Sequence, residues 1–201
     1  MFPIIQAAGG PIWFLLAASV IALALIIERL LALRRTKVLP MRLLEDVLGL
    51  YRAKQITPEV VDRLEGNSPL GRVLAAGLRN ERASRELMKE SIEEAGRAAA
   101  HEMERFLNAL GTIAVTAPLM GLFSTVIGMI EIFGAQTPAG TSPVALAHGI
   151  SVALYNTAFA LVVAIPSLIF YRHFRSRIDD FVAEMEQQAV RFVDVVHGER
   201  E

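Results

Sequence analysis

Two long apolar segments joined by a short loop constrain this chain more than any other feature of its sequence. Residues 107–130 and 132–171 contain no Asp, Glu, Lys or Arg. Each segment exceeds the roughly 20 apolar residues that a helix needs to cross a bilayer. The loop at 134–143 contains two prolines and two glycines, which break helices. The sequence therefore predicts a hairpin of two antiparallel membrane-spanning helices.

A third apolar segment lies near the start of the chain. Residues 11–27 are long enough to span a bilayer, and Trp13 is placed like an interfacial anchor. A cleaved signal peptide is the alternative, because Ala22-Leu23-Ala24 resembles a cleavage site. Signal peptides carry their positive charge before the apolar run, whereas here the first basic residue, Arg29, follows it. We therefore expect a retained span and an all-α integral membrane protein with three transmembrane helices.

The basic residues predict the orientation of these spans. All 20 Lys and Arg residues lie in 28–106 or 172–201, and basic residues are retained on the cytoplasmic side of a membrane. We expect a periplasmic segment and first span at 1–28, a cytoplasmic helical region at 29–106, the transmembrane hairpin at 107–171 with its periplasmic loop at 134–143, and a cytoplasmic C-terminal helix at 172–201. The N-terminus is then periplasmic and the C-terminus cytoplasmic.

The region at 29–106 carries signals for short helices. Thr57-Pro58 and Ser68-Pro69 each place a capping hydroxyl before a proline at the first helical position. From Ser84 no proline interrupts the pattern until Pro118, which predicts that the helix of the second span begins in the cytoplasm and runs unbroken into the membrane. The third span is likewise expected to continue as a long cytoplasmic helix.

The C-terminal helix carries an apolar stripe. Its members recur at helical spacing among charged residues: Ile178, Phe181, Met185, Phe192 and Val195. The stripe packs either on the cytoplasmic helices of the same chain or on a neighbouring copy, and the sequence does not choose between them.

Several kinds of chemistry are absent from the sequence. The chain has no Cys and four scattered His, so it offers no thiolate chemistry and no clustered metal ligands. A net charge of −1 argues against nucleic-acid binding, and no hydrolase triad or phosphate loop is present. We expect no enzyme activity, no cofactor and no metal.

Small and polar residues gather on one face of each hairpin helix. On the second span they are Gly121, Ser124, Thr125 and Gly128, and on the third they are Gly149, Ala153, Asn156, Thr157, Ala160 and Ala164. Such faces either let helices approach closely or line a polar path through the membrane. Pro118 and Pro166 are expected to kink the two helices, because each removes a backbone donor. No Asp, Glu, Lys or Arg lies in the interior of a span, so the chain has no carboxylate of its own to relay protons.

Two motifs in this hairpin resemble the MotA/TolQ/ExbB proton-channel family, and most closely its ExbB-like branch. The first runs Ala117-Pro118-Leu119-Met120-Gly121-Leu122-Phe123-Ser124-Thr125-Val126-Ile127-Gly128. The second runs Gly149-Ile150-Ser151-Val152-Ala153-Leu154-Tyr155-Asn156-Thr157-Ala158 and is followed by Ala164-Ile165-Pro166. The resemblance extends to the number of spans and the size of the cytoplasmic region, and so covers nearly the whole chain.

The resemblance implies an inner-membrane pentamer whose second and third spans enclose the single transmembrane helices of an ExbD-like dimer. That partner carries the Asp that is protonated and released as protons cross the membrane. The pore-lining Thr positions of the family match Thr125 and Thr157, and Asn156 lies beside them as a third candidate for the polar lining. Many members have a Glu where this chain has Val152, so a direct proton-relay role at that position is not expected here.

Three functions fit these observations to different degrees. The resemblance favours an ExbB-like subunit of a proton-driven motor that energises a TonB-like periplasmic protein for outer-membrane import, or a TolQ-like subunit of an envelope-maintenance system. A solute transporter would normally show internal repeats or a broken helix, and neither is seen. A passive membrane scaffold would need only the packing faces. Proton flux that requires a partner protein distinguishes the motor from the other two.

Overall fold

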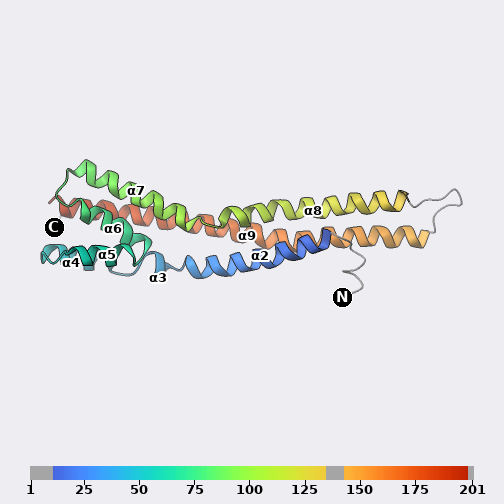
Figure 1. Ribbon diagram of the computed structural model, residues 1–201, viewed down its shortest axis with the longest axis horizontal. Helices are drawn as coiled ribbons and strands as arrows, with labels where there is room; N and C mark the ends of the chain where they lie inside the picture. The colour runs from blue at the N-terminus through green and yellow to red at the C-terminus, as the bar shows by residue number, and fades with distance from the viewer. Residues whose placement is uncertain (1–10, 135–142, 199–201) are drawn as a thin grey trace. The chain divides into compact units, whose positions relative to one another are not determined.

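The computed structural model describes residues 11–134 and 143–198. These residues form helices joined by short turns, and no strand occurs among them. The helices are α2 (Pro11–Ala32), α3 (Arg35–Val38), α4 (Leu43–Arg52), α5 (Pro58–Glu65), α6 (Pro69–Arg79), α7 (Arg85–Met103), α8 (Leu107–Gly134) and α9 (Pro143–Val196) (Figure 1). The segment at 1–10 and nearly all of the expected 134–143 loop lie outside the described residues.

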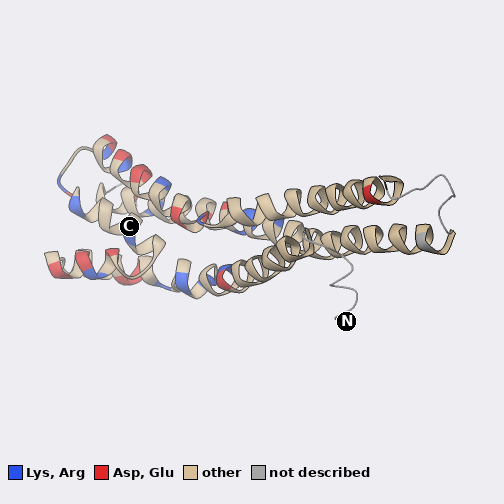
Figure 2. Ribbon diagram, turned by 45° about the vertical axis from the view of Figure 1, so that its right-hand side comes forward, with Lys and Arg blue, Asp and Glu red and all other residues tan. Residues whose placement is uncertain are grey.

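The chain divides into two compact units. The first unit comprises Met1–Glu28 and Phe106–His173, and the second comprises Arg29–Arg105 and Phe174–Glu201. The long helix α9 contributes residues to both units. Lys, Arg, Asp and Glu gather on α4–α7 and on the later part of α9, whereas most of α8 and the earlier part of α9 carry none (Figure 2).

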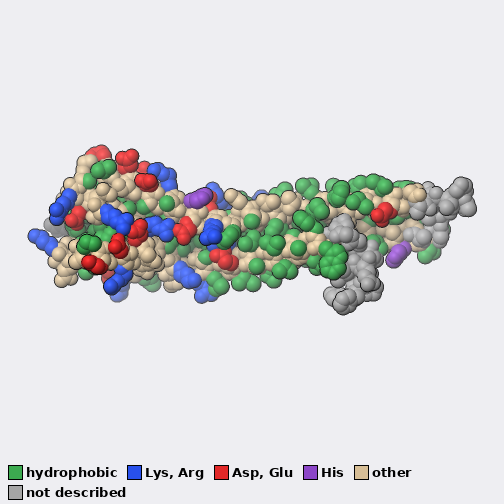
Figure 3. All heavy atoms as spheres, viewed as in Figure 1, with side chains coloured by type: hydrophobic (Ala, Val, Ile, Leu, Met, Phe, Trp, Pro, Cys, Tyr) green, Lys and Arg blue, Asp and Glu red, His purple; other side chains and the backbone are tan. Residues whose placement is uncertain are grey.

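The first unit contains the apolar parts of α2, α8 and α9, and the expectation of an all-α membrane protein with three spans is confirmed. Three helices are long and apolar enough to cross a bilayer: Ile12–Ala32, Leu107–Gly134 and Leu146–Val196. Large hydrophobic side chains on these helices are exposed on the surface of the chain, as Figure 3 shows in green and as Trp13 and Val20 illustrate. The small core of the unit joins Leu15 of α2 to Ala117 of α8 and Ala160 of α9.

The expectation of one unbroken helix from Ser84 into the second span is wrong. Helix α7 ends at Met103, α8 begins at Leu107, and Phe106 between them has a left-handed backbone with φ 67°. No proline or glycine marks this break. The last carbonyls of a helix have no partner within the helix, and the buried Arg29 side chain donates from Nη1 to the carbonyl of Met103 at 2.9 Å. The end of α7 is therefore stabilised by a residue distant in sequence.

The second unit packs α4–α7 with the later part of α9, and it shows where the C-terminal stripe lies. Ile178, Phe181, Met185 and Phe192 are buried within the chain itself, whereas Val195 is half-buried. Helix α6 approaches α9 closely, because a Cβ added at Gly77 would lie 2.7 Å from Cε1 of Phe192. Intrachain packing therefore accounts for four of the five stripe residues.

One of the two expected helix caps, that of Ser68, is present, and Ser84 supplies a cap that the sequence analysis did not predict. Ser68 Oγ accepts from the Gly71 amide at 3.0 Å, and Ser84 Oγ accepts from the Leu87 amide at 3.3 Å. The expectation for Thr57 is wrong, because its side chain makes no cap hydrogen bond although Pro58 does begin α5. A hydrogen bond from the Thr57 side chain to the Glu59 carboxylate lowers the pKa of Glu59 instead.

Candidate functional site

The candidate site lies where α8 and α9 run side by side (Figure 1). A Cβ added at Gly121 would lie 2.7 Å from Cβ of Ala160 and 3.0 Å from Cα of Thr157. One added at Gly128 would lie 3.1 Å from Cβ of Ala153. These gaps are too small for another carbon atom, whose optimal contact distance is about 3.5–4.0 Å. The small residues thus allow two helix backbones to approach closely, as small faces do in lipid.

The same close approach continues at both ends of the hairpin. Toward the loop, a Cβ at Gly149 would lie 2.6 Å from two carbons of the Ile132 side chain. Toward the other end, a Cβ at Gly111 would lie 3.0 Å from the Tyr171 ring. Ala164 is buried in the core that includes Leu15 of α2. The small residues of α8 and α9 therefore form a contact within one chain.

Two polar side chains of α9 cross this contact to α8. Asn156 donates from Nδ2 to Oγ of Ser124 at 2.5 Å, and both side chains are buried. Thr157 donates from Oγ1 to the backbone carbonyl of Gly121 at 3.0 Å. A hydroxyl or amide buried in an apolar setting needs such a partner, because leaving it unpaired is unfavourable. Asn156 and Thr157 therefore stabilise the packing of α9 on α8 through hydrogen bonds.

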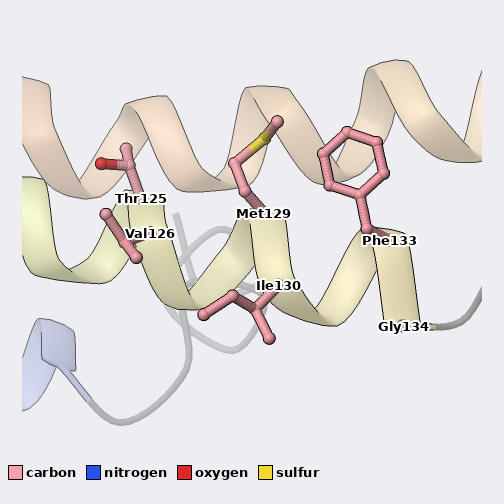
Figure 4. A pocket seen from close by; sticks show the side chains of 6 residues that line it. All are labelled: Thr125, Val126, Met129, Ile130, Phe133 and Gly134. Atoms are coloured by element: carbon pink, nitrogen blue, oxygen red, sulfur yellow. The ribbon is translucent and has the colours of Figure 1, made fainter.

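Thr125 lies differently from Asn156 and Thr157. Its hydroxyl donates to the carbonyl of Leu122 in its own helix at 2.6 Å. The side chain is half-buried and borders an open apolar cavity of about 580 Å³ (Figure 4). The other residues lining this cavity also come from α8: Val126, Met129, Ile130, Phe133 and Gly134. Sequence reasoning grouped Thr125 with Ser124 on one face, but successive helical residues point about 100° apart, and only Ser124 bonds across to α9.

The two prolines lie inside continuous helices, Pro118 in α8 and Pro166 in α9. A proline leaves the carbonyl four residues earlier without its usual donor. The carbonyl that Pro166 leaves without an amide donor is that of Val162; the buried Ser167 donates from Oγ to the next carbonyl, that of Val163, at 2.7 Å. Sequence reasoning missed Ser167, although a hydroxyl directly after a proline in an apolar run is a usable signal.

Two further hydroxyls of α8 also bond within their own helix. Thr112 donates to the carbonyl of Asn108 at 2.7 Å, and Thr116 donates to that of Thr112 at 2.9 Å. Such bonds let hydroxyls lie in an apolar setting without a partner from another helix. No group of three or more His, Cys, Asp or Glu that could hold a metal occurs among residues 11–134 and 143–198.

The comparisons with known proteins all point to one family. The family model described as the MotA/TolQ/ExbB proton channel family matches residues 65–187, which include both motifs of the hairpin. An ExbB-like biopolymer transport protein of Synechocystis sp. is 36% identical over 177 residues, covering 84% of this chain and 82% of that protein.

Two other relatives match shorter stretches. The biopolymer transport protein ExbB of Pseudomonas putida is 32% identical over 124 residues, 61% of this chain and 38% of that protein. The Tol-Pal system protein TolQ of Pseudomonas aeruginosa is 34% identical over 97 residues, 48% of this chain and 42% of that protein. In both cases the chain matches less than half of the relative's length.

Proposed function

Because the chain belongs to the MotA/TolQ/ExbB proton channel family, we propose that it is the ExbB-like subunit of a proton-driven motor in a bacterial inner membrane. In this proposal its partner is an ExbD-like protein with one span and a transmembrane Asp. The observation that carries the proposal is the pair of polar contacts, Asn156 to Ser124 and Thr157 to Gly121, inside the segments 107–130 and 132–171, which contain no Asp, Glu, Lys or Arg.

The partner supplies the group that carries the proton. A bare carboxylate is unfavourable in an apolar environment, so an Asp there is either protonated or solvated by polar groups. In this chain Thr125, Asn156 and Thr157 are the polar groups proposed to line its path. Proton transfer then occurs on the partner, and this subunit provides the polar lining.

The hydrogen bonds of the two threonines define what they offer to that Asp. A hydroxyl has one proton to donate and two lone pairs that accept. Thr125 donates its proton to Leu122, and Thr157 donates its proton to Gly121. Each oxygen is therefore left as an acceptor. An acceptor stabilises a protonated carboxylic acid, whose O–H donates, and not a carboxylate. In this state the subunit favours the protonated form of the partner's Asp. If either hydroxyl rotated so that its proton pointed at the Asp, it would stabilise the carboxylate and so favour release of the proton.

The assembly and the machine that it drives are also part of the proposal. The subunit is proposed to form a homo-oligomer around the partner's spans, and the family resemblance favours a pentamer. The N-terminus and the 134–143 loop are placed in the periplasm, because the basic residues lie on the other side of each span. A TonB-like periplasmic protein is the proposed recipient of the work, for outer-membrane import. A TolQ-like role in envelope maintenance is the second candidate, since a relative named TolQ matches 48% of the chain.

The test is proton flux in proteoliposomes that hold this chain with an ExbD-like partner. We expect flux only when both proteins are present, and we expect it to disappear when the partner's Asp is replaced by Asn. Thr125→Val keeps the side-chain shape and removes the acceptor oxygen, so flux should fall at least tenfold, whereas Thr125→Ser should be milder. Flux through this chain alone would contradict the proposed role of the partner. Full flux with Thr125→Val and Thr157→Val together would contradict the proposed lining.

A further inference from the structure

The second unit holds a polar cavity that the proton-channel function does not use. Its volume is about 530 Å³, within the range of small-molecule sites. The cavity is bordered by α3, by the turn at 39–42, by the first turn of α4 and by the later part of α9. Three arginines from three parts of the chain line it, Arg35, Arg42 and Arg191.

The charges around the cavity do not cancel. Arg35 pairs with Glu184 at 2.5 Å, which fixes one guanidinium at the wall. Glu45 is the second carboxylate of the lining, so three guanidinium groups against two carboxylates leave one positive charge. The amides of Gln187 and Gln188 add uncharged donors. The lining therefore has a surplus of hydrogen-bond donors and of positive charge.

The backbone beside the cavity is strained at one of these arginines. Arg42 has φ 65° and ψ 4°, the left-handed conformation, and it precedes α4 without a side-chain cap. This conformation is unfavourable for a residue with a Cβ, and glycine is the usual residue there. Strained residues cluster at functional sites, although Lys54 and Phe106 also have a positive φ in this chain. Leu44 and Glu45, in the first turn of the helix, border the same cavity, and helix N-termini attract anions.

We propose that this cavity binds a phosphate group, carried by a small phosphorylated compound or by an anionic phospholipid. Guanidinium groups recognise phosphate oxygens with paired hydrogen bonds. Pro40 and the highly exposed Met41 supply an apolar wall for the uncharged part of the ligand. Arg42 and Arg191 bind the phosphate, and Arg35 is held in place by Glu184.

Two variants separate binding from folding. Arg42→Gly removes a guanidinium and also relieves the left-handed strain, so it should lower phosphate affinity at least tenfold while the melting temperature stays the same or rises. Gln187→Glu adds a negative charge at an exposed lining position, and it should also lower the affinity at least tenfold. The matched control is Arg63→Ala, which removes an exposed arginine of α5 outside the cavity and should bind as the parent chain does.

The experiment has two arms on the full chain. In uncharged detergent, equilibrium dialysis measures binding of labelled inorganic phosphate. In nanodiscs, the melting temperature is compared between phosphatidylcholine alone and a mixture with phosphatidylglycerol. Saturable phosphate binding that both variants weaken identifies a soluble phosphorylated ligand. No phosphate binding, but stabilisation by phosphatidylglycerol that both variants lose, identifies a lipid headgroup. Neither effect in the parent chain, or equal effects in the parent and both variants, overturns the proposal.

Discussion

The contact between Gly121 and Ala160 allows a quantitative test of how the two hairpin helices are held together. In Gly121→Ala the new Cβ would lie 2.7 Å from Cβ of Ala160 and 3.0 Å from Cα of Thr157, so the helices must separate by several tenths of an ångström or more. Overpacking of this kind costs about 1–3 kcal/mol. Separation also weakens the two interhelical hydrogen bonds, each worth about 0.6 kcal/mol in membrane proteins. The better helix propensity of Ala returns about 1 kcal/mol.

The expected net destabilisation for Gly121→Ala is about 2 kcal/mol, the balance of overpacking, weakened hydrogen bonds and helix propensity. Ala160→Gly removes a buried methyl group and lowers helix propensity, together also about 2 kcal/mol. In the double variant the 2.7 Å contact is gone, but the 3.0 Å approach to the Thr157 backbone remains. We therefore expect partial rescue, with a favourable coupling of about 1 kcal/mol between the two sites.

The assay is reversible unfolding in mixed detergent and lipid micelles, followed by far-ultraviolet circular dichroism. Gly134→Ala serves as the control, because a Cβ added at Gly134 would meet no atom within 4 Å. This control should be neutral or slightly stabilising. If the free energies of the two single variants add to that of the double variant within about 0.5 kcal/mol, the two residues are not in contact and the close packing of α8 on α9 is refuted.

Four further predictions follow from the described contacts. Asn156→Leu should destabilise the hairpin by about 0.6–1.7 kcal/mol, and Ser124→Ala should add little to it, as a double-variant unfolding cycle would show. Gly71→Ala should unfold much of the second unit, because its Cβ would lie 2.2 Å from the Leu64 carbonyl oxygen, whereas Gly96→Ala has open space and should melt no lower than the parent chain. Arg29→Met should speed amide exchange in the last turn of α7, since the Met103 carbonyl loses its donor; unchanged exchange would show that the bond is dispensable. Thr57→Val should raise the pKa of Glu59 toward its ordinary value of 4.5, measured by nuclear magnetic resonance, because the hydrogen bond that lowers this pKa is lost. The lowered pKa stabilises the fold above pH 4.5, and this contribution disappears as the pH falls through the folded-state pKa.

The spans could be predicted from sequence because a bilayer imposes a simple requirement, about 20 apolar residues without charge. The cap at Ser68 is local and was equally predictable, since its hydroxyl meets an amide three residues later. The break at Phe106 was not, because the side chain that completes the end of α7 is Arg29, 74 residues from Met103. Helical periodicity does not record such a contact.

The candidate site shows a similar division between local and distant information. Periodicity found the small faces of α8 and α9, but it could not say what each face meets. Ser124 and Thr125 are adjacent in sequence, yet one bonds to Asn156 and the other borders an apolar cavity. Likewise the buried Phe192 lies against α6, far away in the chain, at Gly77. In each case the missing information is the identity of a distant partner.

The hydrogen bond from Thr157 to Gly121 restricts substitutions differently at its two ends. Its acceptor is a backbone carbonyl, which every amino acid possesses, so no substitution at position 121 deletes that oxygen. Selection at 121 acts on side-chain volume alone, while selection at 157 acts on the hydroxyl. A saturation library should accordingly tolerate little beyond Gly at 121 and should accept Ser at 157. Suppressors of a lost hydroxyl at 157 should not arise at 121, whereas suppressors of a bulkier residue at 121 should arise on α9, at Ala160 first.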